Sequence, residues 1–167
     1  SGAWEPRRGG DASSSSLAKL SRGQKGIWCD SCFAGDLVCG STRWEEVLRE
    51  AREQGVRLRK VQTREHTFAF GAGSSDAVAT WLGQGTVGGQ VSDVVVDVVK
   101  GPLPFLAGQR FMRTHHIWLA CDGSNAVMQP TSEGLKVLSS GSEPFPELPL
   151  NTVLDSSKEV TSAFYVG

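Results

Sequence analysis

Apolar and polar positions alternate along most of the patterned segments of this chain, and they follow a helical spacing most clearly between Ser41 and Gly55. The apolar residues of that stretch recur three and four positions apart and therefore share one helix face: Trp44, Val47, Leu48 and Ala51. Ser41 suits the N-cap position, and Gly55 suits the residue that ends a helix. The pattern predicts one amphipathic helix that packs on a core.

Shorter patterns predict strands, some of them joined as hairpins. The segments with strand character are 26–29, 56–61, 66–70, 77–82, 90–99, 117–121 and 126–128. Turn residues at 71–76 predict a hairpin, and Asp122-Gly123-Ser124-Asn125 predicts another. A short helical turn is expected at 109–114.

Composition supports a mainly β interpretation, because 20 of the 167 residues are Gly against a usual share of roughly 7%. Residues 1–24 are rich in Ser, Gly and Arg without apolar periodicity, and residues 131–167 contain spaced prolines. We therefore predict a compact domain at 25–130 between an extended N-terminal arm, 1–24, and a Pro-containing C-terminal arm, 131–167.

Aromatic residues in the predicted arms are candidate anchors for other protein chains: Trp4, Phe164 and Tyr165. Docking of these residues onto the chain's own domain is the alternative. The first residue is Ser rather than Met, as after removal of a targeting segment. An organellar location, peripheral to a membrane complex, is the expectation that follows from that residue alone.

Charge and hydropathy exclude some classes of function. The 17 basic and 18 acidic residues give a net charge of −1, which disfavours binding to nucleic acid or to an anionic membrane surface. No apolar run approaches the roughly 20 residues that cross a bilayer. We expect a protein without a membrane span.

Cofactor chemistry is not indicated either. One Cys-x-x-Cys pair, Cys29 and Cys32, allows a metal site or a redox site, yet a second pair at zinc-finger spacing is missing. His115 and His116 are adjacent, so in a strand they point to opposite faces and do not easily bind one ion. We expect no metal and no cofactor, with ordinary buried or half-buried thiols.

Several motifs occur in an order that resembles the retropepsin-like aspartic proteases of retroelement polyproteins. They are a strand ending in Asp30-Ser31, a Cys-Gly before a helix bearing Trp, the hairpin sequence FAFGAG at 68–73, and the run PLPFLAG at 102–108 before a short helix. The resemblance covers about residues 26–128. It implies a small closed β-barrel with one amphipathic helix.

The same resemblance implies which residues form the site. Asp30 and Ser31 match the catalytic Asp-Thr/Ser pair, and Phe70, Gly71 and Gly73 match the flap that closes over substrate. Two carboxylates about 3 Å apart share a proton in such enzymes. This chain offers one matching Asp, so an active enzyme would have to be a homodimer.

Two departures from the family pattern concern the catalytic loop. Cys32 stands where the signature has Gly, and the stretch from Asp30 to Gly40 is about one residue longer than usual. The first hypothesis is therefore a degenerate, non-catalytic domain that serves as a structural or binding subunit of a larger protein assembly. An active homodimeric aspartic endopeptidase that processes a retroelement polyprotein is the alternative, and a thiol redox module at Cys29 and Cys32 is a third.

Overall fold

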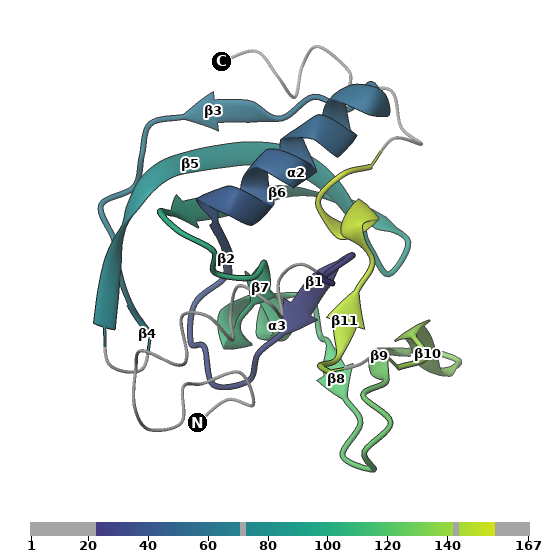
Figure 1. Ribbon diagram of the computed structural model, residues 1–167. Coiled ribbons are helices and arrows are strands. Elements are labelled where there is room, and N and C mark those ends of the chain that lie inside the picture. The colour runs from purple at the N-terminus through teal and green to yellow at the C-terminus, as the bar shows by residue number, and fades with distance from the viewer. Residues whose placement is uncertain (1–22, 71–72, 142–143, 156–167) are drawn as a thin grey trace.

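The computed structural model describes residues 23–70, 73–141 and 144–155 (Figure 1). Trp4, Phe164 and Tyr165, the predicted anchors, lie outside the described residues. An eight-stranded sheet contains β1 (Ile27–Cys29), β2 (Leu37–Gly40), β3 (Arg59–Val61), β4 (Thr67–Phe70), β5 (Gly73–Val87), β6 (Gln90–Val99), β7 (Leu106–Ala107) and β11 (Glu147–Leu148). A three-stranded sheet contains β8 (Trp118–Leu119), β9 (Val127–Thr131) and β10 (Gly134–Ser139). The helices are α2 (Ser41–Glu53), α3 (Gln109–Thr114) and the 3-10 turn η1 (Leu150–Thr152).

The large sheet has the strand order β11-β1-β7-β2-β6-β5-β3, with β4 paired to β5 beside this path. The prediction of a mainly β fold is confirmed. A closed barrel is not found, because among the described strands β11 and β3 end the pairing order and do not pair with each other. Figure 1 shows β5 and β6 as one long, curved ribbon beside α2.

Helix α2 forms where the apolar spacing predicts it. Trp44, Val47 and Ala51 are buried and belong to the larger core. The N-cap differs from the prediction: Gly40 occupies that position, and the Ser41 hydroxyl instead accepts a hydrogen bond from the Gly101 amide, 3.0 Å away. Ser41 therefore ties the start of the helix to the loop after β6.

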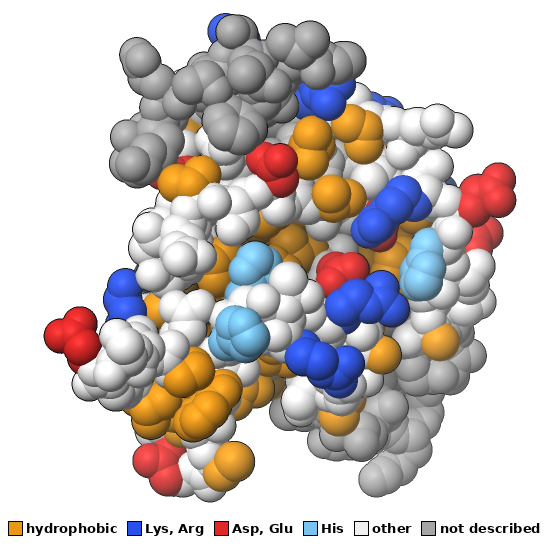
Figure 2. Space-filling view, turned by 180° about the vertical axis from the view of Figure 1, so that it is seen from behind, with side chains coloured by type: hydrophobic (Ala, Val, Ile, Leu, Met, Phe, Trp, Pro, Cys, Tyr) orange, Lys and Arg blue, Asp and Glu red, His pale blue; other side chains and the backbone are white. Residues whose placement is uncertain are grey.

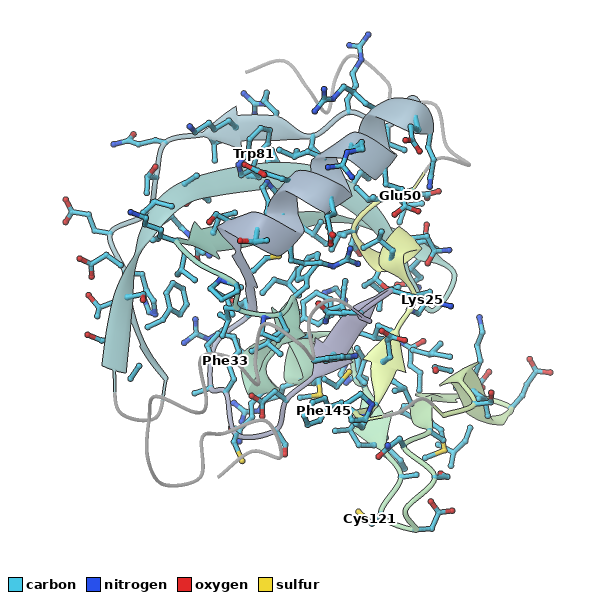
Figure 3. All side chains as sticks on the ribbon, viewed as in Figure 1. Lys25, Phe33, Glu50, Trp81, Cys121 and Phe145 are labelled. Atoms are coloured by element: carbon cyan, nitrogen blue, oxygen red, sulfur yellow. The ribbon has the colours of Figure 1, made fainter. Side chains whose placement is uncertain are left out.

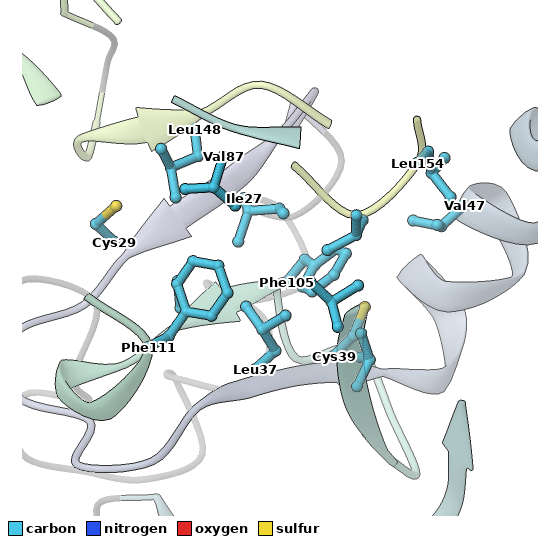
Figure 4. Close-up of a cluster of buried hydrophobic side chains, with 14 of the residues drawn as sticks. Ile27, Cys29, Leu37, Cys39, Val47, Val87, Phe105, Phe111, Leu148 and Leu154 are labelled. Carbon is cyan, nitrogen blue, oxygen red and sulfur yellow. The ribbon is translucent and has the colours of Figure 1, made fainter. Parts of the chain in front are cut away.

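Two hydrophobic clusters lie on opposite sides of β1. Ile27 and Cys29 point into the larger cluster, which Figure 4 shows around Phe105 and Leu148. Trp28 points into the smaller cluster, where its ring lies 4.9 Å from that of Phe145. This alternation is the expected consequence of strand geometry. It means that β1 is covered on both faces.

The predicted C-terminal arm does not begin at residue 131. Residues 134–139 form β10, and residues 144–155 pack against the sheet through β11 and η1. Phe145, Leu148, Val153 and Leu154 are all buried. The prolines that suggested an arm end strands and turns in this segment rather than detaching it. The compact body thus continues to Asp155, and residues 156–167 lie outside the described part.

The N-terminal boundary also shifts slightly. Gln24 was assigned to the N-terminal arm, yet it is buried and its side-chain amide exchanges two hydrogen bonds with the backbone of Phe105, at 2.7 and 2.8 Å. These bonds hold the entry to β1 against the segment before β7. Residues 1–22 of the predicted arm lie outside the description.

Candidate functional site

The candidate site lies where β7 is inserted between β1 and β2, two strands that follow each other in sequence. β7 runs parallel to β1 and antiparallel to β2. Backbone hydrogen bonds from Trp28 N–H to the Phe105 carbonyl and from Asp30 N–H to the Ala107 carbonyl, 3.0 and 2.9 Å long, fix this register. Asp30 therefore sits at the end of β1, with its backbone anchored to β7.

The Asp30 side chain is buried and takes part in a local turn. Its exposed fraction is 5%, and its Oδ1 accepts a hydrogen bond from the Cys32 backbone N–H, 2.9 Å away. The Phe33 N–H donates to the Asp30 carbonyl at 3.1 Å. A backbone amide that binds a carboxylate fixes the direction of the side chain.

Ser31 and Cys32 both lie on the surface. The Ser31 carbonyl accepts a hydrogen bond from the side-chain amide of Gln109 in α3. His116 and Asn125 are the non-glycine residues with positive φ in the described segments, so Cys32 has a backbone conformation that any residue can adopt. Cys32, at the position where the resemblance leads us to expect glycine, therefore does not strain this loop.

Residues 33–36, where we expected the additional loop residue, hold the start of α3. The carbonyls of Asp36, Phe33 and Gly35 accept hydrogen bonds from the N–H groups of Gly108, Gln109 and Arg110 respectively, at 2.7, 2.7 and 3.1 Å. These amides lie at the helix N-terminus, where the helix itself offers no acceptors. Residues 33–36 are thus bonded to the start of α3.

Gly108 makes this arrangement sterically possible. A Cβ atom added there would lie 2.3 Å from the Gly35 carbonyl oxygen and 2.6 Å from that of Phe33. The Arg110 guanidinium adds an exposed ion pair with Asp36 at 3.4 Å. The loop and α3 therefore form one unit that positions Asp30.

The predicted flap is a hairpin of β4 and β5 in which Phe70 is paired with Gly73. Gly71, the third predicted flap residue, lies outside the described residues. Phe68 of β4 is buried in the smaller cluster, and its ring lies 6.0 Å from that of Phe33 in the loop after β1. Figure 3 shows Phe33 on the side of the molecule that carries β4. The structure thus places the base of the hairpin against the loop that contains Asp30.

The two cysteines of the Cys-x-x-Cys pair lie in different surroundings. Burial raises the pKa of Cys29 to about 12, and the neighbouring charges of Asp30 and Glu147 act in the same direction. Cys32 is exposed, and both thiols are free. A redox dithiol needs a thiolate that forms readily. The burial of Cys29 therefore does not favour the redox interpretation.

The other candidate ligand groups do not assemble. Within the described residues, no three His, Cys, Asp or Glu side chains are arranged to hold a metal ion. His115 packs on the Phe111 ring. Its pKa is lowered, mainly because the side chain is partly buried and secondly because His116 lies nearby. Within the same ranges, no helix has the length and apolar character to cross a bilayer.

One buried polar network was not predicted. The Asp97 carboxylate, 4% exposed, accepts hydrogen bonds from Arg64 Nε at 3.1 Å and from the Thr80 hydroxyl at 2.9 Å. The Arg64 N–H in turn donates to the Thr80 hydroxyl oxygen. The signal in the sequence was Asp97 itself, an acidic residue inside a valine-rich strand. This network joins β5, β6 and the segment before β4.

Comparison with known proteins gives no relative. No family model matches the chain, no curated protein matches it, and no solved structure matches it. The proposals below therefore depend on the residues and their geometry, together with the resemblance in motifs.

Proposed function

We propose that this chain forms one half of an aspartic endopeptidase site and that two copies assemble the complete site. The observation that carries the proposal is the buried Asp30 carboxylate, held by the Cys32 amide at the point where β7 enters between β1 and β2. The proposal assigns the retropepsin type to the fold, with a second copy completing the barrel-like enclosure around the two acids.

The chemistry requires a second carboxylate. At a separation of about 3 Å the two Asp30 side chains would share one proton, because both cannot be ionised so close together. The ionised carboxylate takes a proton from water as it attacks the peptide carbonyl, and the protonated one donates to the carbonyl oxygen. The β4–β5 hairpin would cover the bound peptide and exclude bulk water.

Two features of the loop support the catalytic hypothesis. The grounds for a non-catalytic domain were Cys32 and the longer loop. Cys32 has an unstrained backbone, and its N–H donates a hydrogen bond to the Asp30 carboxylate. The carbonyls of the longer loop accept hydrogen bonds from the first amides of α3. Both departures are thus compatible with a correctly held carboxylate.

A non-catalytic binding subunit is the second candidate, and one observation favours it. Cys32 is exposed two positions after Asp30, so its Cβ and sulfur would add volume between two copies that met at Asp30. In this case the domain would join other protein chains of a multi-subunit assembly through its terminal arms, and Asp30 would have a structural role.

Cleavage of a mixed peptide library at mildly acidic pH tests the proposal. We expect pepstatin-sensitive cleavage by the unaltered chain, loss of cleavage in Asp30→Asn, and unchanged cleavage in Asp93→Asn, whose exposed carboxyl lies on β6. Cleavage should also rise with the square of protein concentration at low concentration, because the site needs two copies.

Cys32→Gly separates the two candidates. An inactive chain that becomes active with Cys32→Gly would support the non-catalytic candidate and identify Cys32 as the block. Absence of cleavage in both the unaltered chain and Cys32→Gly, with both folded, would contradict the proposed enzyme.

A further inference from the structure

The three-stranded sheet of β8, β9 and β10 is attached to the body of the molecule by one face. Val127 is fully buried, and Leu119 and Leu138 pack against the larger core. The Lys136 ammonium donates a hydrogen bond to the Gly88 carbonyl in the β5–β6 turn, 3.3 Å away. These contacts define the inner face of the sheet.

The outer face is apolar across all three strands. Trp118 pairs with Met128, and Met128 pairs with Val137, so their side chains form one row on the same face. Pro130 and Leu135 form the next row. We call these five residues the outer patch.

The outer patch is the main concentration of exposed apolar surface on the described part of the chain. The exposed fractions are 52% for Trp118, 52% for Leu135 and 57% for Val137. The other exposed large apolar residues of the described ranges, Val78 and Val91, lie on β5 and β6. Figure 2 shows hydrophobic side chains gathered at the lower left, over this sheet. An antiparallel sheet with one face in water normally carries polar residues on that face. An apolar face therefore indicates a surface that is covered in the working protein.

We propose that residues 162–166 of this same chain, Ser-Ala-Phe-Tyr-Val, cover the outer patch. The last described residue, Asp155, lies against β5 of the large sheet: the Asp155 N–H donates to the Gln84 carbonyl at 3.0 Å, and its carboxylate accepts from the Thr86 hydroxyl. Thr86, Thr152 and Val137 line one cavity of about 180 Å³. Asp155, the last described residue, therefore bonds a strand that shares this cavity with β10.

Length and chemistry both suit this occupant. Phe164 follows Asp155 by nine positions, which an extended chain spans over roughly 30 Å. Phe, Tyr and Val favour strands, and in the described residues the outer edge of β10 has no neighbouring strand to bond its N–H and C=O groups. An added strand would satisfy those groups and place alternate side chains on the patch.

The size of the patch distinguishes a short segment from a second folded copy. The exposed parts of three large side chains amount to on the order of a few hundred Å². A stable interface between folded proteins buries at least about 1,200 Å² in total. A short segment tethered to the same chain needs much less area, because its effective concentration is high.

Hydroxyl-radical footprinting of the full chain, read by mass spectrometry, tests the proposal at the side chains concerned. We expect slow oxidation of Trp118 and Met128 in the unaltered chain. In the double variant Phe164→Ser/Tyr165→Ser the rate should rise roughly tenfold, while Met112, which is buried in the core, should not change. Trp4→Ser is the matched control, because it removes an aromatic residue outside the proposed segment and should leave both rates slow.

A second pair of variants tests the patch itself. Val137→Lys should expose Trp118 in the same way, whereas Val91→Lys, an exposed valine on β6, should not. Fast oxidation of Trp118 in the unaltered chain would overturn the proposal. So would protection that survives the double variant, or protection that disappears on dilution, since the latter would identify a second copy as the occupant. The readout does not depend on protease activity, so it is separate from the proposed function.

Discussion

The backbone carbonyl of Thr152 crosses β5 directly at Gly85, so closely that a Cβ atom added to Gly85 would lie 1.5 Å from its oxygen. This approach lets the C-terminal part of the fold lie against the long ribbon. Val153 and Leu154, the next residues, are buried in the larger core, and Asp155 bonds Thr86. Because Gly85 has no side chain, residues 150–155 can pack against β5 at this position.

Gly85→Ala should therefore destabilise the fold. The Cβ atom collides with backbone, so the segment 150–155 must move away and its buried side chains lose contacts, at a cost of about 3 kcal/mol. Thermal and urea unfolding measure the effect. Gly55→Ala is the control: Gly55 has φ +70° and no atom near its Cβ position, so its cost should be about 1 kcal/mol. Equal losses in the two variants would contradict the steric account.

Asp97→Asn should lower the free energy of unfolding by about 2 kcal/mol, the usual worth of hydrogen bonds to a charged group. The amide preserves the shape of the side chain but weakens the bonds from Arg64 and Thr80. Chemical denaturation of this variant and of Asp93→Asn, on the same strand, gives the comparison. Asp93 is exposed, so its variant should unfold like the unaltered chain; a matching loss would point to a general charge effect.

Thiol reactivity should divide the four cysteines into two classes. At pH 8 iodoacetamide should modify the exposed Cys32 and Cys121 and leave Cys29 and Cys39 unmodified, because burial raises the pKa of both buried thiols. Figure 3 shows Cys121 at the end of the β8–β9 hairpin, away from the core. Peptide mapping under native and denaturing conditions identifies the sites. Rapid native modification of Cys29 would contradict its burial.

The Cys29 thiol also predicts a dependence of stability on pH. Its pKa is about 12 in the fold against an ordinary value of 9.0. Unfolding at alkaline pH therefore releases a proton, so stability is fully present below pH 9 and falls as the pH rises towards 12. Unfolding curves of the unaltered chain and Cys29→Ala between pH 8 and pH 11 measure this. The variant should show the shallower decline, and parallel curves would rule out a contribution from this thiol.

Gly108→Ala should disturb the loop that carries Asp30 without unfolding the protein. The added Cβ meets the carbonyls of Gly35 and Phe33, so the hydrogen bonds that join residues 33–36 to α3 must lengthen. We expect faster hydrogen exchange at Gly108, Gln109 and Arg110, and reduced peptide cleavage if the chain is active. Unchanged exchange at these three amides would show that the loop tolerates the Cβ.

Much of the local structure could be predicted because short-range patterns determine it. The apolar spacing of α2, the β4–β5 hairpin, the helical turn of α3 and the turn at 122–125 all depend on residues a few positions apart. The insertion of β7 between β1 and β2 could not be derived in this way, because it joins residues about 80 positions apart. The resemblance in motifs pointed to the residues concerned, but not to the hydrogen bonds between residues 33–36 and α3.

The misassigned C-terminal boundary has a related cause. Residues 144–155 show no apolar periodicity, and their prolines are typical of a loop. Phe145, Leu148 and Leu154 nevertheless become buried, since they fill spaces that exist only after the sheet has formed. Asp97 was visible as an unusual acid in a valine-rich strand, but its partners Arg64 and Thr80 come from separate segments.

The amino-acid sequence by itself determined the elements with a clear local pattern, among them α2, the turn of α3 and the β4–β5 hairpin, since backbone preference and side-chain period act between near neighbours. Only the tertiary structure decided which strands lie side by side, that the sheet stays open, that Asp30 is buried with its carboxylate on the Cys32 amide, and that an apolar row faces outwards on β8–β10. Those outcomes depend on packing between segments that are distant in the sequence. At Gly85, for example, the absence of a side chain allows the Thr152 carbonyl to lie against β5.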